Sequence, residues 1–300
     1  MLDITKKPSE NEFNIVGILN QIKVKEGTSP KSGDNYISID LEVRVDQEIN
    51  GEATENIIPV GLFASRHKKG TQELNVNYDR ISKLKDSLVS LGMVDKGEEN
   101  KASRIVIPAE IKENSFYGKT GSLVNSWRLS SNFVNFQRPS DEEGATFTVT
   151  GVVGKKWRET DKEGNETGRL FVRLCVITFG GVANVIDFVA YGSKADFIEE
   201  HWQKGDTIKC AGYISMTHKV VERAEETGFG DPIVTKHTVS SRELIIDRGC
   251  GEGLSDAYAY DADDIKVALD KRQAYLASLE ENAKKGATKP ATKVDPEFNF

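Results

Sequence analysis

The sequence has few cysteines and no long apolar run. Its three cysteines are far apart, show no CxxC spacing and leave an odd count, which favours a reducing compartment and structural or incidental thiols. No apolar run approaches the ~20 residues that span a membrane, and the N-terminal residues 1–13 lack the apolar region of a secretory signal. We therefore expect a cytoplasmic protein with no membrane partner.

Signatures of catalysis and of metal binding are also scarce. The sequence contains no GxxxxGK[ST], HExxH or GxSxG motif, and these are the patterns that mark phosphate-binding loops, zinc proteases and serine hydrolases. Its four histidines show no metal-ligand spacing. The acidic run at residues 260–264 lacks the glycine and the distal glutamate of a calcium loop. We expect no enzymatic activity, no cofactor and no metal.

Net charge does not by itself decide for or against nucleic acid. The chain carries a formal charge of −7 among 29% charged residues. Phosphate binding requires local lysine and arginine, and the total can still be acidic. The argument therefore depends on where the basic residues lie.

Two strand-rich blocks follow one another, at residues 1–138 and 144–250, with a polar linker at 139–143. Alternating apolar residues and glycine-rich turns predict strands in the first block at residues 13–25, 36–45, 57–63, 103–113 and 122–136, with a helix at 79–91. The second block is expected to form strands at residues 146–158, 169–177, 185–192, 206–221 and 236–247, with a helix at 194–203. The shared order indicates two barrels in tandem.

The last fifty residues, 251–300, have a different composition. An acidic stretch comes first, and apolar residues near helical spacing then predict a helix at 262–283. The end of the chain is rich in lysine, threonine, proline and alanine, so we expect a disordered tail.

The run FVAYGSKADFIEEHWQKGDTIKCAGYI at residues 188–214 resembles the bacterial single-stranded DNA-binding protein family. Its order of strand, glycine, helix, Lys-Gly turn and strand is similar to theirs. The resemblance implies an all-β fold with short helices: two tandem five-stranded OB-fold barrels, a C-terminal helix and a flexible tail. It covers residues 146–247 well and the first block only in strand order. Two barrels in one chain look like a phage-encoded member of the family, which would act in the cytoplasm of a bacterial host. A homo-oligomer is also compatible with this resemblance.

The strand at residues 169–177 carries the strongest site signal. Alternation places Leu170 and its apolar neighbours on the core side, and Arg169, Phe171 and Arg173 on the outer face. A base can stack on Phe171 while the arginines neutralise phosphates. Alternatively, a loop or the other barrel covers this phenylalanine.

A tryptophan among cations lies where the first strand of the second block meets its loop. Here Lys155, Lys156, Trp157 and Arg158 would hold base and backbone together, or Trp157 would close one end of the barrel. Lys219 belongs to a hairpin that could act as an arm over the strand. By contrast, Trp202 in the predicted helix is expected in the core.

The first block offers a second set of basic and aromatic residues. Its charge runs are either solvated loops or part of a binding face, and the first barrel either binds DNA or only supports the second barrel. The candidates are Lys23, Lys25, Tyr36, Arg66, Lys68, Lys69, Phe116, Tyr117, Lys119, Trp127 and Arg128.

The C-terminal tip combines acids and aromatics at Asp295, Glu297, Phe298 and Phe300. By resemblance to the family, the tip would recruit replication or recombination proteins by placing its phenylalanines in an apolar pocket ringed by cations. It could instead fold back on the DNA-binding groove, or be a frayed terminus.

The sequence as a whole favours sequence-independent binding and protection of single-stranded DNA in replication, recombination or repair. A protein-interaction scaffold or virion component without significant DNA binding is the main alternative. The second alternative is a nucleic-acid enzyme that uses one barrel as a substrate clamp.

Overall fold

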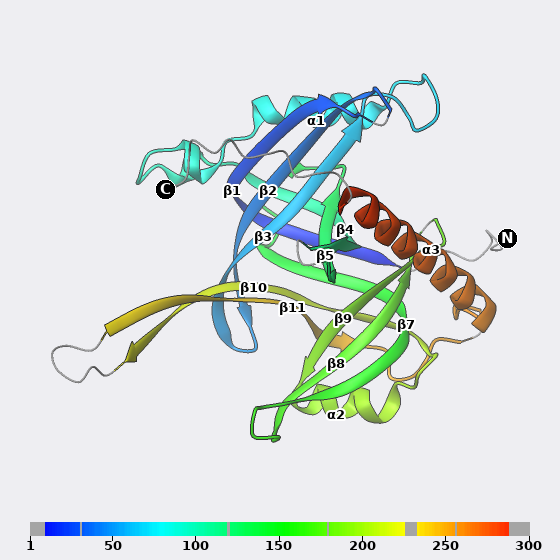
Figure 1. The fold of residues 1–300 in the computed structure, drawn as a ribbon. Coiled ribbons are helices and arrows are strands. Elements are labelled where there is room, and N and C mark those ends of the chain that lie inside the picture. The colour runs from blue at the N-terminus through cyan, green and yellow to red at the C-terminus, as the bar shows by residue number, and fades with distance from the viewer. Residues whose placement is uncertain are drawn as a thin grey trace, which may run out of the picture.

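A computed structural model describes residues 10–30, 32–118, 121–178, 180–225, 233–255 and 257–287. For residues 218–225, 233–239 and 285–287 the backbone alone is described. Strands dominate this part of the chain, and they form two barrels that lie one above the other in Figure 1.

Five strands close the first barrel. They are β1 (Asn11–Thr28), β2 (Asn35–Ile49), β3 (Glu52–Ser65), β4 (Arg104–Tyr117) and β5 (Leu123–Ser131). They run in the order β1-β2-β3-β5-β4, and β4 pairs back onto β1 to close the sheet. The β3–β5 contact is parallel and the other pairings are antiparallel. This is the pairing order of a five-stranded OB-fold barrel.

The second barrel repeats this order with β7 (Gly144–Thr160), β8 (Glu166–Ile177), β9 (Ala183–Tyr191), β10 (Thr207–Glu225) and β11 (Ile233–Gly249). It closes through β10 and β7, and β9 pairs with β11 in parallel. The predicted fold class, two tandem OB-fold barrels followed by a C-terminal helix, is therefore confirmed.

One predicted strand is divided in two. We expected a single strand over 122–136, whereas β5 ends at Ser131 and a short strand β6 (Asn135–Phe136) pairs with β4. The Ser131 hydroxyl donates to the backbone oxygen of Phe133 at 2.9 Å and accepts from its N–H at 3.0 Å. Such local side-chain bonds compete with the strand ladder and end it.

Helices lie where each barrel passes from its third strand to its fourth. They are α1 (Val76–Ser87) and α2 (Gly192–His201), with short 3-10 turns η1 (Leu91–Met93) and η2 (Glu99–Lys101) after α1. Helix α1 begins three residues earlier than expected because Asn75 caps it, accepting from the N–H of Asn77. Trp202, directly after α2, is 1% exposed, which confirms its core position.

The two barrels share one hydrophobic core. Alternation along β8 buries Leu170, Val172, Leu174 and Val176 completely. Strands β1 and β7 pair directly, from Asn11 to Val16 against Gly144 to Val149. Across this seam the rings of Phe13 and Phe147 stack with centroids 5.6 Å apart. No pattern in the sequence indicated this pairing between the barrels.

Each barrel bends sharply at one glycine. A Cβ at Gly17 would lie 2.2 Å from the Arg44 carbonyl oxygen, and one at Gly212 would lie 1.8 Å from that of Ile245. Only glycine allows so close an approach of neighbouring strands, and such close approaches let a sheet curl into a small barrel.

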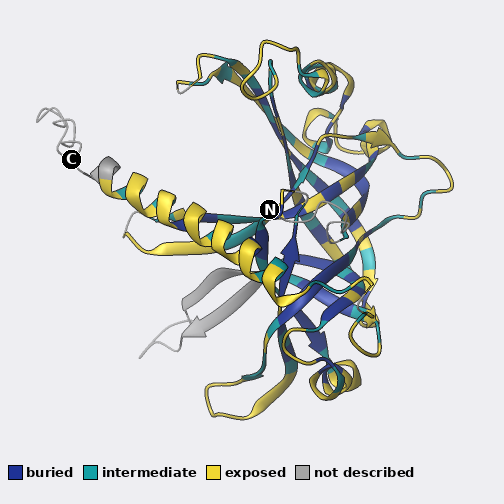
Figure 2. Ribbon diagram, turned by 90° about the vertical axis from the view of Figure 1, so that its right-hand side faces the viewer, coloured by how far each residue is buried: buried dark blue, intermediate teal, exposed yellow. Residues whose placement is uncertain are grey.

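Helix α3 (Ala262–Ala287) begins near the level where the barrels meet and projects away from both barrels toward its C-terminal end (Figure 2). Ala268 packs on a small cluster with Cys175 and Val152 of the second barrel. Cys175 thus lies on the outer face of β8, where α3 covers it. No helix in the described ranges is long and apolar enough to cross a membrane.

Candidate nucleic-acid interface

Two aromatic side chains stack on each other at the outer face of the second barrel. Trp157 of β7 and Phe171 of β8 are register partners, and their rings stack at 5.4 Å with an interplanar angle of 11°. The cationic groups of Lys155 and Arg173 both lie 5.3 Å from the centre of the Trp157 ring. We call these four residues the stacking platform. Both rings are half-buried, and both cations are exposed.

Arg169 shares this face but is already neutralised. Its guanidinium bonds Glu159 at 2.9 Å and also pairs with Glu243, whose other oxygen accepts from the Tyr191 hydroxyl at 2.6 Å. Burial opposes the charge on Arg169, but Glu243 and Glu159 outweigh burial and raise its pKa. Burial and the bond to Glu243 also raise the pKa of Tyr191 to about 12. Arg169 therefore supports the face and is not free for a phosphate.

Lys156 and Arg158 point the other way, toward α2. The Lys156 ammonium donates to the carbonyl oxygens of Ile198 at 3.2 Å and Glu199 at 2.6 Å, and to that of Trp202. Burial lowers the pKa of Lys156. Arg158 binds Glu199 and Asp196, whose carboxylates raise its pKa. The structure thus separates these two predicted site residues from the stacking platform.

A groove where the barrels meet, of about 460 Å³, extends the platform toward the first barrel. We call it the junction groove. Trp127 of β5 lines this groove together with Phe171 and Arg173 of β8. Trp127 and Phe171 were predicted separately, in different blocks, and the fold brings both to one hollow.

Arg242 of β11 also lines the junction groove, and the sequence analysis missed it. Its guanidinium carbon lies 3.8 Å from the centre of the Trp127 ring, and it donates to the Trp127 carbonyl oxygen. The two residues are 115 positions apart in the sequence, so no local pattern could have indicated the contact.

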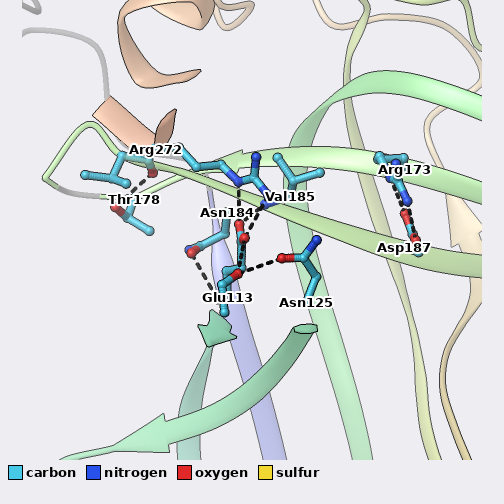
Figure 3. Close-up of polar contacts among 10 residues, drawn as sticks. Glu113, Asn125, Arg173, Thr178, Asn184, Val185, Asp187 and Arg272 are labelled. Carbon is cyan, nitrogen blue, oxygen red and sulfur yellow. Dashed lines mark hydrogen bonds and ion pairs between the residues drawn. The ribbon is translucent and has the colours of Figure 1, made fainter. Parts of the chain in front are cut away.

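Ion pairs border the groove (Figure 3). Arg173 bonds both oxygens of Asp187, at 2.6 and 2.8 Å. Arg272 of α3 reaches Glu113 of β4 with two bonds, at 2.6 and 2.7 Å. Burial alone would raise the pKa of Glu113, but Arg272, Ser115 and the Val185 N–H hold it below its usual range.

The first barrel has a hollow of about 520 Å³ on its equivalent outer face. Phe63 and Phe133 line it, 60% and 47% exposed. Tyr36 stacks on Phe63 at 5.8 Å. Predicted Arg128 lines the hollow as well, together with the acids Asp40 and Glu110. Phe63 could have been identified from the sequence, because Ile58, Val60 and Leu62 alternate inward and leave it outward.

The remaining predicted residues in the described ranges do not line these surfaces. Lys23 lies 3.8 Å from Glu42, and Lys68 pairs with Glu73. Phe116 and Tyr117 lie at the far end of β4, outside the junction groove. Of these remaining predicted residues, Lys25, Arg66 and Lys69 are exposed and form no ion pair in the described ranges. Lys119, the side chain of Lys219, and the tip residues Asp295, Glu297, Phe298 and Phe300 lie outside the described residues.

No group of three or more His, Cys, Asp or Glu side chains is placed to hold a metal ion in the part of the chain that the structure describes. The candidate site is therefore an extended surface of aromatic rings and cations, arranged over the outer faces of two barrels.

The fold is similar to that of solved single-stranded DNA-binding proteins. A deletion mutant of the protein from Thermus aquaticus superposes with a TM-score of 0.50 at 12% identity, covering 85% of this chain and 98% of that chain. The wild-type Thermus aquaticus protein gives a TM-score of 0.49 with the same identity and coverage. At this identity the likeness extends to the fold.

A search of curated proteins finds no match to this sequence. The family model described as YorF matches residues 9–282, which include both barrels and most of α3. The chain therefore belongs to the YorF family.

Proposed function

We propose that this protein binds single-stranded DNA without sequence preference and shields it during replication, recombination or repair. The observation that carries the proposal is the stacking platform, where Trp157 and Phe171 lie nearly parallel and the cations of Lys155 and Arg173 both approach the Trp157 ring. Every base has a face that can stack on an aromatic ring, so such a surface is tolerant of sequence.

Binding would combine stacking with charge neutralisation. Base–aromatic stacking contributes about 1–3 kcal/mol per base, and each neutralised phosphate releases counterions into solution. Lys155 has no carboxylate partner among the described residues and is exposed, so its ammonium is available to a phosphate. Affinity should accordingly fall as salt concentration rises.

The first-barrel hollow is proposed to engage the same strand. Phe63, Phe133 and Arg128 supply aromatic surface and charge there, although Asp40 and Glu110 make this face less cationic. We also propose that the first domain ends at residue 138 and that the second begins at residue 144. The C-terminal tip is proposed to recruit replication proteins. The protein is proposed to have no catalytic activity and to act in the cytoplasm of a bacterial host. The structural relatives named above are single-stranded DNA-binding proteins, which supports the proposal at the level of fold.

Fluorescence anisotropy of labelled oligo-dT, duplex DNA and RNA at two salt concentrations tests this function. We expect tight, salt-sensitive binding to oligo-dT and little affinity for the duplex. Absence of oligo-dT binding at low salt, both with the full chain and with residues 288–300 removed to exclude self-inhibition, would refute the proposal.

A protein-interaction scaffold is the second candidate. The neutralised arginines favour it, because Arg169 and Arg173 of the binding face are both held by carboxylates. Salt-insensitive, weak DNA binding together with a stable complex with another protein would select this function.

A further inference from the structure

Trp127 and Arg242 form a composite surface in the junction groove, which Phe171 also lines. Arg242 covers the indole at 3.8 Å, and its terminal nitrogens donate to the Trp127 carbonyl oxygen and, at 3.4 Å, to the Ser126 hydroxyl. These contacts hold the guanidinium over the ring. A guanidinium plane held in this way is itself a surface on which a base can stack.

Arg242 differs from the other arginines of the groove in forming no ion pair within the described ranges. Arg173 is paired with Asp187, and Arg272 with Glu113. No carboxylate in the described ranges forms an ion pair with Arg242. Surrounding protein atoms lower its pKa by desolvation, while the residue keeps an exposed surface in the groove. A partly desolvated cation without an anion is the arrangement that a bound phosphate would complete.

We propose that the junction groove is a nucleotide subsite, which holds one unpaired base of a strand passing from one barrel to the other. The base stacks on the Trp127–Arg242 surface, and an adjacent phosphate accepts from Arg242. This inference rests on the proposed function. It adds a binding site that neither barrel forms alone, because Trp127 comes from the first barrel and Arg242 from the second.

The dimensions and the polar lining fit this ligand. The volume of about 460 Å³ is within the range of roughly 300–1,000 Å³ that small-ligand pockets span. Asn125 and Ser126 line the same wall as Trp127 and offer hydrogen-bonding groups to a base edge. A base in this position has left its complementary strand, so the subsite favours single strands over duplex.

Tryptophan fluorescence can detect the subsite directly. In a Trp157→Phe variant the tryptophans are Trp127 and Trp202, and Trp202 is 1% exposed in the core. Labelled oligo-dT is titrated while anisotropy and tryptophan emission are recorded together. We expect emission to change as anisotropy rises. Rising anisotropy with constant emission would overturn the subsite and leave the proposed function intact, whereas unchanged anisotropy in both this variant and the unsubstituted protein would overturn both.

Arg242→Ala provides a second test that does not depend on emission. We expect a loss of oligo-dT affinity of about 5- to 150-fold, as for one stacked base, and a reduction of about 0.7 in the salt slope, as for one phosphate contact. Arg248→Ala is the matched control, because Arg248 is an exposed arginine on the same strand and lines the pocket beside α2. Equal affinity of Arg242→Ala and Arg248→Ala for oligo-dT would contradict the subsite.

Discussion

The neighbouring lysines Lys155 and Lys156 have different environments, because successive side chains of a strand point to opposite faces. Lys155 lies beside Trp157 on the stacking platform. Lys156 instead occupies the carbonyl groups at the C-terminal end of α2, where a cation also complements the helix dipole. One lysine is available to a ligand, and the other stabilises the fold.

Substitution of these two lysines should separate binding from stability. Lys156→Met is expected to lower the free energy of unfolding by about 1–2 kcal/mol, because backbone acceptors lose their donor, and to leave DNA affinity nearly unchanged. Lys155→Met should reduce the salt slope of oligo-dT binding by about 0.7 without changing stability. Urea denaturation and anisotropy titrations measure both quantities, and the reverse pattern would contradict the assignment.

A β-bulge explains why the sequence did not separate Lys155 from Lys156. Phe147, Val149 and Val153 point into the core, and uninterrupted alternation would place Lys155 inward with them. The register shifts between Val153 and Lys155, so the phase reverses at Gly154. A glycine inside a strand is a known sign of a bulge, but it does not specify which way the following residues turn.

Among the elements, α3 is joined to the first barrel by an ion pair between Arg272 and Glu113. Glu113 has a side chain 9% exposed and Arg272 one 19% exposed. Glu113 also joins the barrels, since its N–H donates to Asn184 of β9 at 3.0 Å and its carboxylate accepts from the Val185 N–H at 3.2 Å. The helix and both barrels therefore meet at one carboxylate.

Stability should depend on the ionisation of Glu113 at acidic pH. The pKa of Glu113 in the folded protein lies below the usual value. The stabilisation that ionised Glu113 provides is therefore complete above about pH 4.3, the usual pKa of glutamate. This stabilisation is lost as the pH falls through the lowered pKa of the folded state. Glu113→Gln should lower the free energy of unfolding by about 3 kcal/mol at neutral pH, as for a broken buried ion pair. The variant should also lose less stability than the unsubstituted protein as the pH becomes acidic.

Unfolding by urea between pH 3 and 7 measures this effect. Glu110→Gln is the control, because Glu110 lies on the exposed side of the same strand. If Glu113→Gln kept the neutral stability of the unsubstituted protein, the ion pair would have no role in attaching α3.

At the scale of the whole molecule, two binding faces in one chain should act together on a long strand. Once one barrel holds the strand, the other binds at a high effective concentration, which can raise affinity by 10²–10⁴-fold. Oligo-dT long enough for both faces should therefore bind roughly 10²-fold more tightly than one that reaches only a single face.

Phe63→Ala should reduce this gain for long oligonucleotides and leave short ones unaffected, because Phe63 lines the first-barrel hollow. Phe136→Ala removes an equally exposed phenylalanine, at 57%, and serves as the control. An affinity that does not change with oligonucleotide length would show that the first barrel only supports the second.

The sequence predicted the strand order and both barrels because period-two alternation and glycine turns are local signals. It also predicted the aromatic residues of the platform. It could not predict the β1–β7 pairing, or that Trp127 contacts Arg242 in the groove that Phe171 lines, because these contacts join segments far apart in the chain and depend on how the barrels dock.

The central claim is that single-stranded DNA stacks on the outer face of the second barrel. Anisotropy titration of oligo-dT with Phe171→Ala tests it most directly, with Phe197→Ala as the control because that phenylalanine is 43% exposed on α2. We predict that Phe171→Ala loses about 1–3 kcal/mol of binding free energy for oligo-dT and that Phe197→Ala loses none. Wild-type affinity in a folded Phe171→Ala protein would contradict the account.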